Sequence, residues 1–248
     1  MIEERNDPPQ PFLAHLLALR TCIVSSFAAW AGCSILCGVY SRTILEWIKV
    51  PAAQLERTGR VSLEGLEFTS GISIVLDIAL WGGLALSFPF IAFFVLKFIF
   101  PALTRREKMS ILTYLVFGTV GFAAGFTLAY AKMLPVAVGF FDAVNDWVGL
   151  PVSTVRIEGY VSIVLKAILG LGLVFQIPLM LFVLGCLGVV SSAALRKARK
   201  FAIVVAFFLG MVLTPPDPMS QFIMAVPLCI LYELAIWGVW LKEKAVDR

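Results

Sequence analysis

Long apolar runs separated by short polar segments make up most of this sequence. Most of the runs approach the about 20 residues that an α-helix needs to cross the roughly 30 Å hydrocarbon core of a bilayer. Six crossings are predicted, at about residues 22–40, 71–97, 110–131, 159–190, 201–213 and 219–240. Because these runs leave no room for a separate soluble domain, we expect residues 1–248 to form a single all-α, polytopic integral membrane domain with six transmembrane helices.

Some of the runs differ from a plain crossing. Residues 12–20 read as an amphipathic helix at the membrane interface that leads into the first crossing. The fourth run contains Pro178, where a kink is expected. The fifth run, 201–213, is only about 20 Å long at the helical rise, which predicts either a buried half-helix or a short crossing that thins the membrane. We expect the last two helices to be short.

The composition supports a membrane protein and excludes several site types. Hydrophobic residues make up 60% of the chain and charged residues 15%, which is too little polar surface for a soluble protein of this size. The net charge of +4 is small and spread over loops, so no nucleic-acid surface is expected, and membrane lipid is the expected surrounding. His15 is the single histidine, and the five cysteines lie in apolar runs without metal-site spacing. We expect no metal and no cofactor.

The distribution of Lys and Arg predicts the orientation in the membrane. With six crossings, both termini lie on the same side. The segments on that side carry thirteen Lys or Arg residues, and the polar segments 41–70 and 132–158 on the opposite side carry six. Because positively charged loops stay in the cytoplasm, we expect both termini to be cytoplasmic and the two long polar loops to face outward.

Two charges are predicted to lie inside the membrane. Asp77 and Lys166 fall about 9 to 12 Å from the same end of their crossings, so the two side chains could meet. An unpaired charge at that depth costs at least about 2.5 kcal/mol, which favours a buried pair or a water-filled cavity. An ion pair that locks two helices together, a role in transport and an outward-pointing Lys166 all remain open. Gln176, two residues before Pro178, is either a functional polar group or a donor to carbonyls freed by that proline.

A charged loop at residues 98–109 is the strongest candidate for a functional site. It holds a single acid, Glu107, and four basic residues lie in or beside it: Lys97, Arg105, Arg106 and Lys108. Glu107 is either a solvated residue at a helix start or a ligand for a cationic guest.

Several kinds of chemistry are missing from the sequence. It has no glycine-rich phosphate-binding loop with a G-x-x-x-x-G-K-[ST] pattern and no H-E-x-x-H motif. The only histidine precedes the first crossing, so no base is expected beside an intramembrane nucleophile. We therefore expect no enzyme, but a carrier, a channel or a receptor-like part of a translocation machine.

Four sequence motifs occur in a characteristic order. They are HLLALR at His15–Arg20, FIFPAL at Phe98–Leu103 followed by Arg106-Glu107, GMVLTPPDPMSQ at Gly210–Gln221, and Ala225-Val226-Pro227 with Tyr232-Glu233. Together with the six crossings they resemble the TatC family, the C subunit of the twin-arginine protein translocase. The resemblance covers essentially the whole chain.

The resemblance implies a function and a set of site residues. TatC proteins bind twin-arginine signal peptides at the cytoplasmic face of the inner membrane. With TatA- and TatB-like single-helix partners, they pass folded proteins across it using the proton-motive force. A hetero-oligomer is therefore expected. Carried over, the signal-peptide site comprises Glu107, Arg105, His15, Leu19 and Arg20, and the residues that shape the last helices for partners are Pro216, Asp217, Gln221 and Glu233. A cap of the last helix is an equally good interpretation of Asp217.

Two departures from the family pattern concern acids. The family usually has glutamate where this chain has Ala18 and often where it has Gln176. Losing one of two carboxylates should weaken binding of paired arginines by about 1.5 to 3 kcal/mol, or roughly ten- to a hundredfold. Glu107 would then carry most of the recognition, helped by backbone carbonyls or by Glu3 or Glu4. A divergent paralogue with altered cargo is the other interpretation, and we favour a working receptor.

A different class of protein is the alternative. A small ion-coupled secondary transporter would use Asp77 and Lys166 beside its substrate path. Such transporters often contain inverted repeats, and the two halves of this chain have unlike loops.

Overall fold

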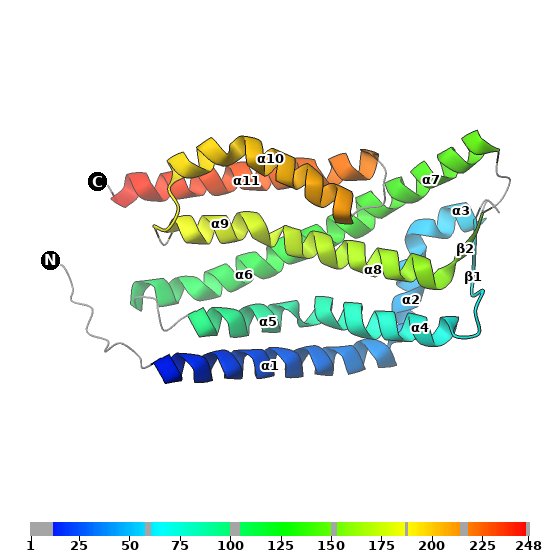
Figure 1. Ribbon diagram of the computed structural model, residues 1–248, viewed down its shortest axis with the longest axis horizontal. Helices are drawn as coiled ribbons and strands as arrows, with labels where there is room; N and C mark the ends of the chain where they lie inside the picture. The colour runs from blue at the N-terminus through cyan, green and yellow to red at the C-terminus, as the bar shows by residue number, and fades with distance from the viewer. Residues whose placement is uncertain are drawn as a thin grey trace.

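The computed structural model describes residues 12–57, 61–99, 105–149, 153–186, 188–213 and 218–246. Within these ranges, the side chains of residues 12–14, 54, 55, 99, 105–114, 153, 186 and 246 are not described. Long helices lie side by side along one direction (Figure 1). We call the end at which α1 begins and α11 ends the terminal end, and the end that carries the two short strands the β end.

Five helical stretches of the described chain are long and apolar enough to cross a membrane: His15–Val39, Ser70–Phe98, Leu115–Val148, Ile157–Gly185 and Pro218–Ala245. They are built from α1 (Phe12–Val39), α4 (Ser70–Asp77), α5 (Gly83–Ile99), α6 (Arg105–Leu128), α7 (Leu134–Val148), α8 (Ile157–Val174), α9 (Gln176–Cys186) and α11 (Pro218–Val246). The protein is thus a polytopic helical membrane protein, as predicted.

The last two helices are longer than their apolar runs. α10 (Ser192–Leu213) has 22 residues, because the basic cluster before residue 201 belongs to the same helix as the apolar run after it. α11 has 29 residues and continues through charged residues at its end. The expected shortness therefore describes the apolar half of α10 and not the helices themselves. Lys, Arg and Glu are good helix formers, so a change from apolar to charged side chains does not end a helix.

The two polar segments expected as loops contain regular structure. The first forms α2 (Ser41–Lys49), the 3₁₀ turn η1 (Val50–Ala52), α3 (Ala53–Arg57) and strand β1 (Val61–Glu64). In the second, α7 continues from α6 and ends at Gly149, whose φ of 84° places it in the left-handed region. Strand β2 (Ser153–Arg156) then pairs with β1 in parallel. Arg156 forms an ion pair with Glu67 at 2.8 Å, so the two segments close the β end together.

Two π-helical segments interrupt the long helices, η2 (Ile78–Gly82) between α4 and α5 and η4 (Ala129–Met133) between α6 and α7. The wider π turn presents backbone carbonyls to neighbouring helices, which can donate hydrogen bonds to them. The indole N–H of Trp30 in α1 donates to the carbonyl of Leu80 at 3.1 Å, and the hydroxyl of Ser220 in α11 donates to that of Met133 at 3.4 Å. Each π segment is therefore fastened to another crossing.

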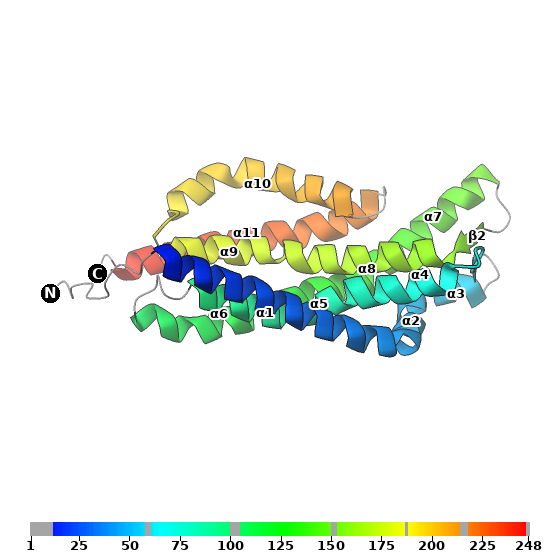
Figure 2. The same cartoon turned by 60° about the horizontal axis from the view of Figure 1, so that its bottom comes forward.

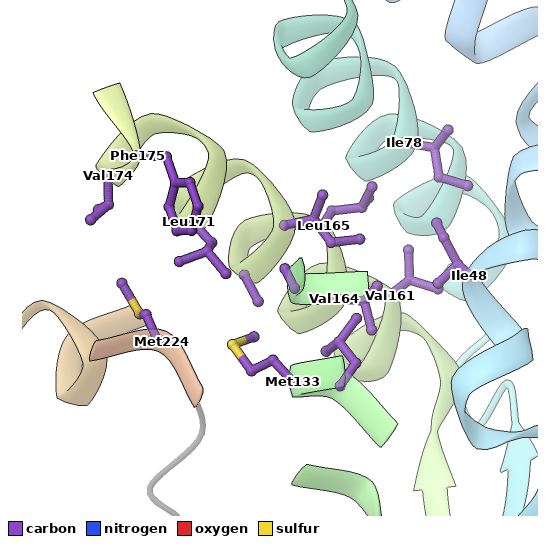
Figure 3. Packing of buried hydrophobic residues seen from close by; sticks show 14 of the residues in the cluster. Ile48, Ile78, Met133, Val161, Val164, Leu165, Leu171, Val174, Phe175 and Met224 are labelled. Atoms are coloured by element: carbon purple, nitrogen blue, oxygen red, sulfur yellow. The ribbon is translucent and has the colours of Figure 1, made fainter. Parts of the chain in front are cut away.

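Helix α8 lies at the centre of the packing. Its Val161, Val164 and Leu171 are fully buried. Figure 3 shows Val161 and Val164 between Ile78 and Met133, which belong to the two π segments, and Leu171 beside Phe175. α8 contacts α4, α6 and α10. Because α8 is surrounded by other helices, its side chains are apolar on nearly every face of the helix.

Candidate functional site

The first and second sequence motifs meet at the terminal end. The ring of His15, near the start of α1, lies 4.7 Å from the ring of Phe98, at the end of α5. α1 and α5 pack against each other along much of their length. A Cβ atom on Gly83 would lie only 2.5 Å from the Cα atom of Ser34, so glycine permits this close approach. The fold therefore brings HLLALR beside the segment that leads into α6.

Glu107 and Arg105 lie in the first turn of α6, which begins at Arg105. An acid in the first turn of a helix interacts favourably with the helix dipole. The side chains of both residues lie outside the described part of the chain, as do residues 100–104.

The remaining residues of the first motif lie on α1. Leu19 is 37% exposed, Arg20 is exposed, and Ala18 is half-buried. His15 and Leu19 are four residues apart and share one face of the helix, because residues i and i+4 lie above one another. His15, Leu19 and Arg20 are thus accessible side chains at the terminal end.

Gln176 joins two helices. The helix of the fourth crossing is interrupted at Phe175, between α8 and α9 and three residues before Pro178. Gln176 is the first residue of α9. Its Nε2 donates to the carbonyl of Gly118 in α6 at 3.2 Å and to that of Gly172 in α8 at 3.3 Å. Both acceptors are carbonyls, so the position uses the donor capacity of an amide. An ionised glutamate has no such donor.

Two other motif residues, Gln221 and Glu233, connect α10 to α11 through side-chain contacts. Gln221 Nε2 donates to the carbonyl of Phe207 at 2.9 Å, and Gly210 leaves the space in which the Gln221 side chain lies. Arg199 Nη2 donates to Glu233 Oε2 at 2.7 Å. The predictions for Pro216 and Asp217 fall outside the described residues, and α11 begins at Pro218.

Asp77 and Lys166, both described, form no ion pair, so of the alternatives left open by the sequence the structure does not show the buried pair. The ammonium group of Lys166 instead lies over the ring of Trp81, 5.6 Å from its centroid. Helical side chains lean toward the N-terminus of their helix, which for Lys166 is the β end. Lys166 is exposed and lines a cavity of about 590 Å³ at that end, which also contains Tyr160 and Arg156.

The described residues contain no group of three or more His, Cys, Asp or Glu side chains that could hold a metal. The thiols of Cys22, Cys33, Cys37 and Cys229 are free.

Sequence reasoning missed several interhelical hydrogen bonds. The hydroxyls of Tyr130 and Tyr160 donate to the carbonyls of Trp47 and Ile48 at the end of α2, at 2.7 and 3.0 Å. The Tyr232 hydroxyl donates to the Leu195 carbonyl at 2.8 Å. A buried tyrosine usually finds a hydrogen-bond acceptor, but the sequence carries no signal of which carbonyl will be near.

Comparison with known proteins settles the family. Residues 14–227 match the model of the family described as Sec-independent protein translocase protein (TatC). This chain belongs to the TatC family. The resemblance found in the motifs is thereby confirmed.

Relatives and solved structures of the TatC family agree along nearly the full length. The TatC protein of Magnetococcus marinus is 32% identical and covers 96% of this chain and 87% of the relative. Those of Escherichia coli and Deinococcus radiodurans are 32% and 30% identical, each covering 92% of this chain and 87% of the relative. A crystal structure of the twin arginine translocase receptor TatC matches with a TM-score of 0.78 at 30% identity, over 92% of this chain and 99% of that one.

TatC family membership decides between the two classes of function weighed from the sequence. The chain is a multi-pass membrane subunit of the Sec-independent, twin-arginine translocase, and the family is not enzymatic. A small ion-coupled transporter built on Asp77 and Lys166 is correspondingly disfavoured, and the structure does not pair these two charges.

Proposed function

We propose that this chain is the core receptor subunit of the translocase. It binds twin-arginine signal peptides at its cytoplasmic face and, with TatA- and TatB-like single-helix partners, exports folded proteins using the proton-motive force. The observation that carries the proposal is the contact between His15 and Phe98 at 4.7 Å. That contact joins the first motif to the loop motif, so residues 80 or more positions apart in the sequence form one surface.

Glu107 is the proposed ligand of the paired arginines. A carboxylate accepts two parallel hydrogen bonds from the planar fork of an arginine, whereas a lysine offers a single charged point. Discrimination between arginine and lysine therefore follows from the shape of the guest group and not from its charge. Arg105 and Arg20 are the proposed cationic residues of the site, and their charge would oppose binding of a cationic guest that does not pair with the carboxylate.

Partner helices are proposed to dock on α10 and α11. These helices lie at one edge of the bundle, as Figure 2 shows for α10. An apolar groove of about 560 Å³ runs between them and is lined by Phe207, Val226, Cys229, Ile230, Glu233, Leu234 and Trp237. The ion pair with Arg199 neutralises Glu233, which lets an apolar helix approach it. Gln221, Pro216 and Asp217 would fix the geometry of the connection between α10 and α11.

Binding of a paired-arginine peptide to the purified full-length chain in lipid nanodiscs tests the receptor proposal. Fluorescence anisotropy compares a twin-arginine signal peptide with its twin-lysine form. Wild type should prefer arginine by roughly ten- to a hundredfold, and Glu107→Gln should lose that preference. Glu64→Gln, which removes an exposed acid at the β end, is the matched control. If Glu107→Gln retained the preference and still exported a twin-arginine reporter in cells, the role given to Glu107 would be wrong.

A further inference from the structure

Five exposed cations gather at the terminal end of the α10–α11 pair. They come from the start of α10 and the end of α11: Arg196, Lys197, Lys200, Lys242 and Lys244. The two segments lie next to each other because α10 and α11 form one of the most extensive helix contacts of the fold (Figure 1). The sequence separates the two groups by more than 40 residues, so only the fold makes them one surface.

The acids of the same two helices are already engaged. Glu243 accepts hydrogen bonds from the backbone N–H of Ser192, at 2.8 Å, and from the Ser192 hydroxyl. Glu233 is paired with Arg199. No other acid occurs in the described residues of α10 and α11. Glu243 keeps its negative charge and also interacts with Arg196, so the described residues of the two helices place one unpaired carboxylate beside five cations. The cluster therefore stays strongly positive. The N-terminus of α10 is satisfied by Glu243 and is not the site.

Two cations of this cluster lie near the ring of Trp240. The guanidinium carbon of Arg196 lies 5.9 Å from the centroid of the Trp240 ring, and the ammonium nitrogen of Lys244 lies 5.2 Å from it. Lys200 follows Arg196 by one helical turn. Tryptophan is enriched at the depth of lipid headgroups, where its ring is partly apolar and its N–H stays wet. Trp240 thus marks the level at which Arg196 and Lys244 meet the membrane surface.

The apolar groove between α10 and α11 leads up to these cations. On α11, Ile230, Trp237 and Lys244 are spaced by seven residues and share one face. On α10, Phe207 of the groove lies seven residues after Lys200, on the same face. One continuous surface is therefore cationic at the terminal end and apolar at membrane depth, which matches the division of a phospholipid into headgroup and acyl chains.

From these observations we infer that the phosphate headgroup of an anionic membrane phospholipid binds to a site that we call the cationic mouth. The site consists of Arg196, Lys200, Lys244 and Trp240. The acyl chains lie along the apolar side chains below Trp240, so this lipid and the partner helix proposed above would compete for the groove between α10 and α11. Each Lys or Arg near the membrane surface strengthens attraction to anionic lipid about fivefold, and salt screens that attraction. The site does not depend on the signal-peptide proposal, because it involves neither Glu107 nor the first motif.

Native mass spectrometry of lipid retention tests this site. The full-length protein in neutral detergent is incubated with equal amounts of dioleoylphosphatidylglycerol and dioleoylphosphatidylcholine. Wild type should retain the anionic lipid preferentially, and the variant Arg196→Gln/Lys200→Gln/Lys244→Gln should lose that preference by tenfold or more. The matched control removes three exposed cations at the β end, Arg42→Gln/Arg57→Gln/Lys132→Gln, and should behave like wild type.

Further arms of the same experiment separate the possible occupants. Raising the salt concentration should release the anionic lipid from wild type and leave phosphatidylcholine unchanged, a measurement that needs no variant to fold. Equal retention of the two lipids, an equal loss in both triple variants, or full competition by soluble glycerol phosphate would each overturn the inference. The inference would also be wrong if an apolar single-helix peptide displaced the lipid equally well from wild type and from the cationic-mouth variant. The groove would then be a protein-binding site without headgroup recognition.

Discussion

Gln176 donates a hydrogen bond from its side-chain amide to the backbone carbonyl of Gly118, 3.2 Å away. This bond ties the start of α9 to α6 at the point where the fourth crossing is broken. The same amide nitrogen reaches the carbonyl of Gly172, so it bridges the two sides of the break and a neighbouring helix. This chain therefore has a glutamine where the family often has glutamate, and the glutamine donates hydrogen bonds that an ionised glutamate could not donate.

Replacing Gln176 by glutamate should lower stability at neutral pH by about 1 to 3 kcal/mol, because an ionised carboxylate would face two carbonyl oxygens without a donor. Gln176→Met removes the hydrogen bonds without adding charge and should cost about 1 kcal/mol. Thermal unfolding in detergent measures both. At acidic pH the glutamate variant should recover, since a protonated carboxylic acid can donate. Identical behaviour of the two variants at every pH would contradict this account of the site.

Gly125 should not tolerate a side chain. A Cβ atom there would lie 2.8 Å from the carbonyl oxygen of Leu171 and 3.0 Å from the Cα atom of Gly172, and backbone atoms of α8 cannot easily move aside. We expect Gly125→Ala to destabilise the protein by about 1 to 3 kcal/mol. Gly139→Ala in α7 is the control, because a Cβ there meets nothing within 4 Å and should raise stability by about 0.5 to 1 kcal/mol. Unfolding curves that shift in the same direction for both variants would argue against close packing of α6 on α8.

Asp77 and Lys166 should behave as independent charges. Because the Lys166 ammonium lies over Trp81 and is not paired with Asp77, Asp77→Asn should leave the amount of protein in the membrane unchanged. The exchanged variant Asp77→Lys/Lys166→Asp should show no gain over the sum of its single changes, which immunoblotting of membranes and unfolding of the purified variants would measure. A coupling energy above about 1 kcal/mol would instead reveal an ion pair.

Ala18→Glu should strengthen recognition of a twin-arginine peptide by roughly ten- to a hundredfold, because it adds a second carboxylate at the position where the family usually has one. Ala18 is half-buried on α1, one turn from the His15–Phe98 contact. Ala18→Gln is the control of similar size without charge. Equal affinities of the two variants in the anisotropy assay would mean that position 18 does not face the guest.

Hydropathy along the chain was sufficient to predict the helical membrane class and the order of the long helices, whereas the family was recognised from four sequence motifs. Those features follow from the transfer free energy of each side chain into the bilayer, which is a local property of the sequence. Local polarity was a poorer guide to where helices end. The sequence predicted that residues 132–158 form a loop, because the segment is rich in turn formers, yet α7 extends from Leu134 to Val148. Pro135 is tolerated there because it closely follows the π segment η4, where the regular α-helical hydrogen-bond pattern is already interrupted.

Only the tertiary structure decided which groups meet. The contact of His15 with Phe98, the hydrogen bond of Trp30 to Leu80 and the approach of Arg196 to Trp240 each join helices whose adjacency no local pattern encodes. The two π segments are likewise invisible in the sequence, since their carbonyls are satisfied by side chains from other crossings. The bilayer fixes which segments become helices, because no backbone polar group can stay unpaired in it. The fit of side chains between neighbouring helices then fixes their arrangement.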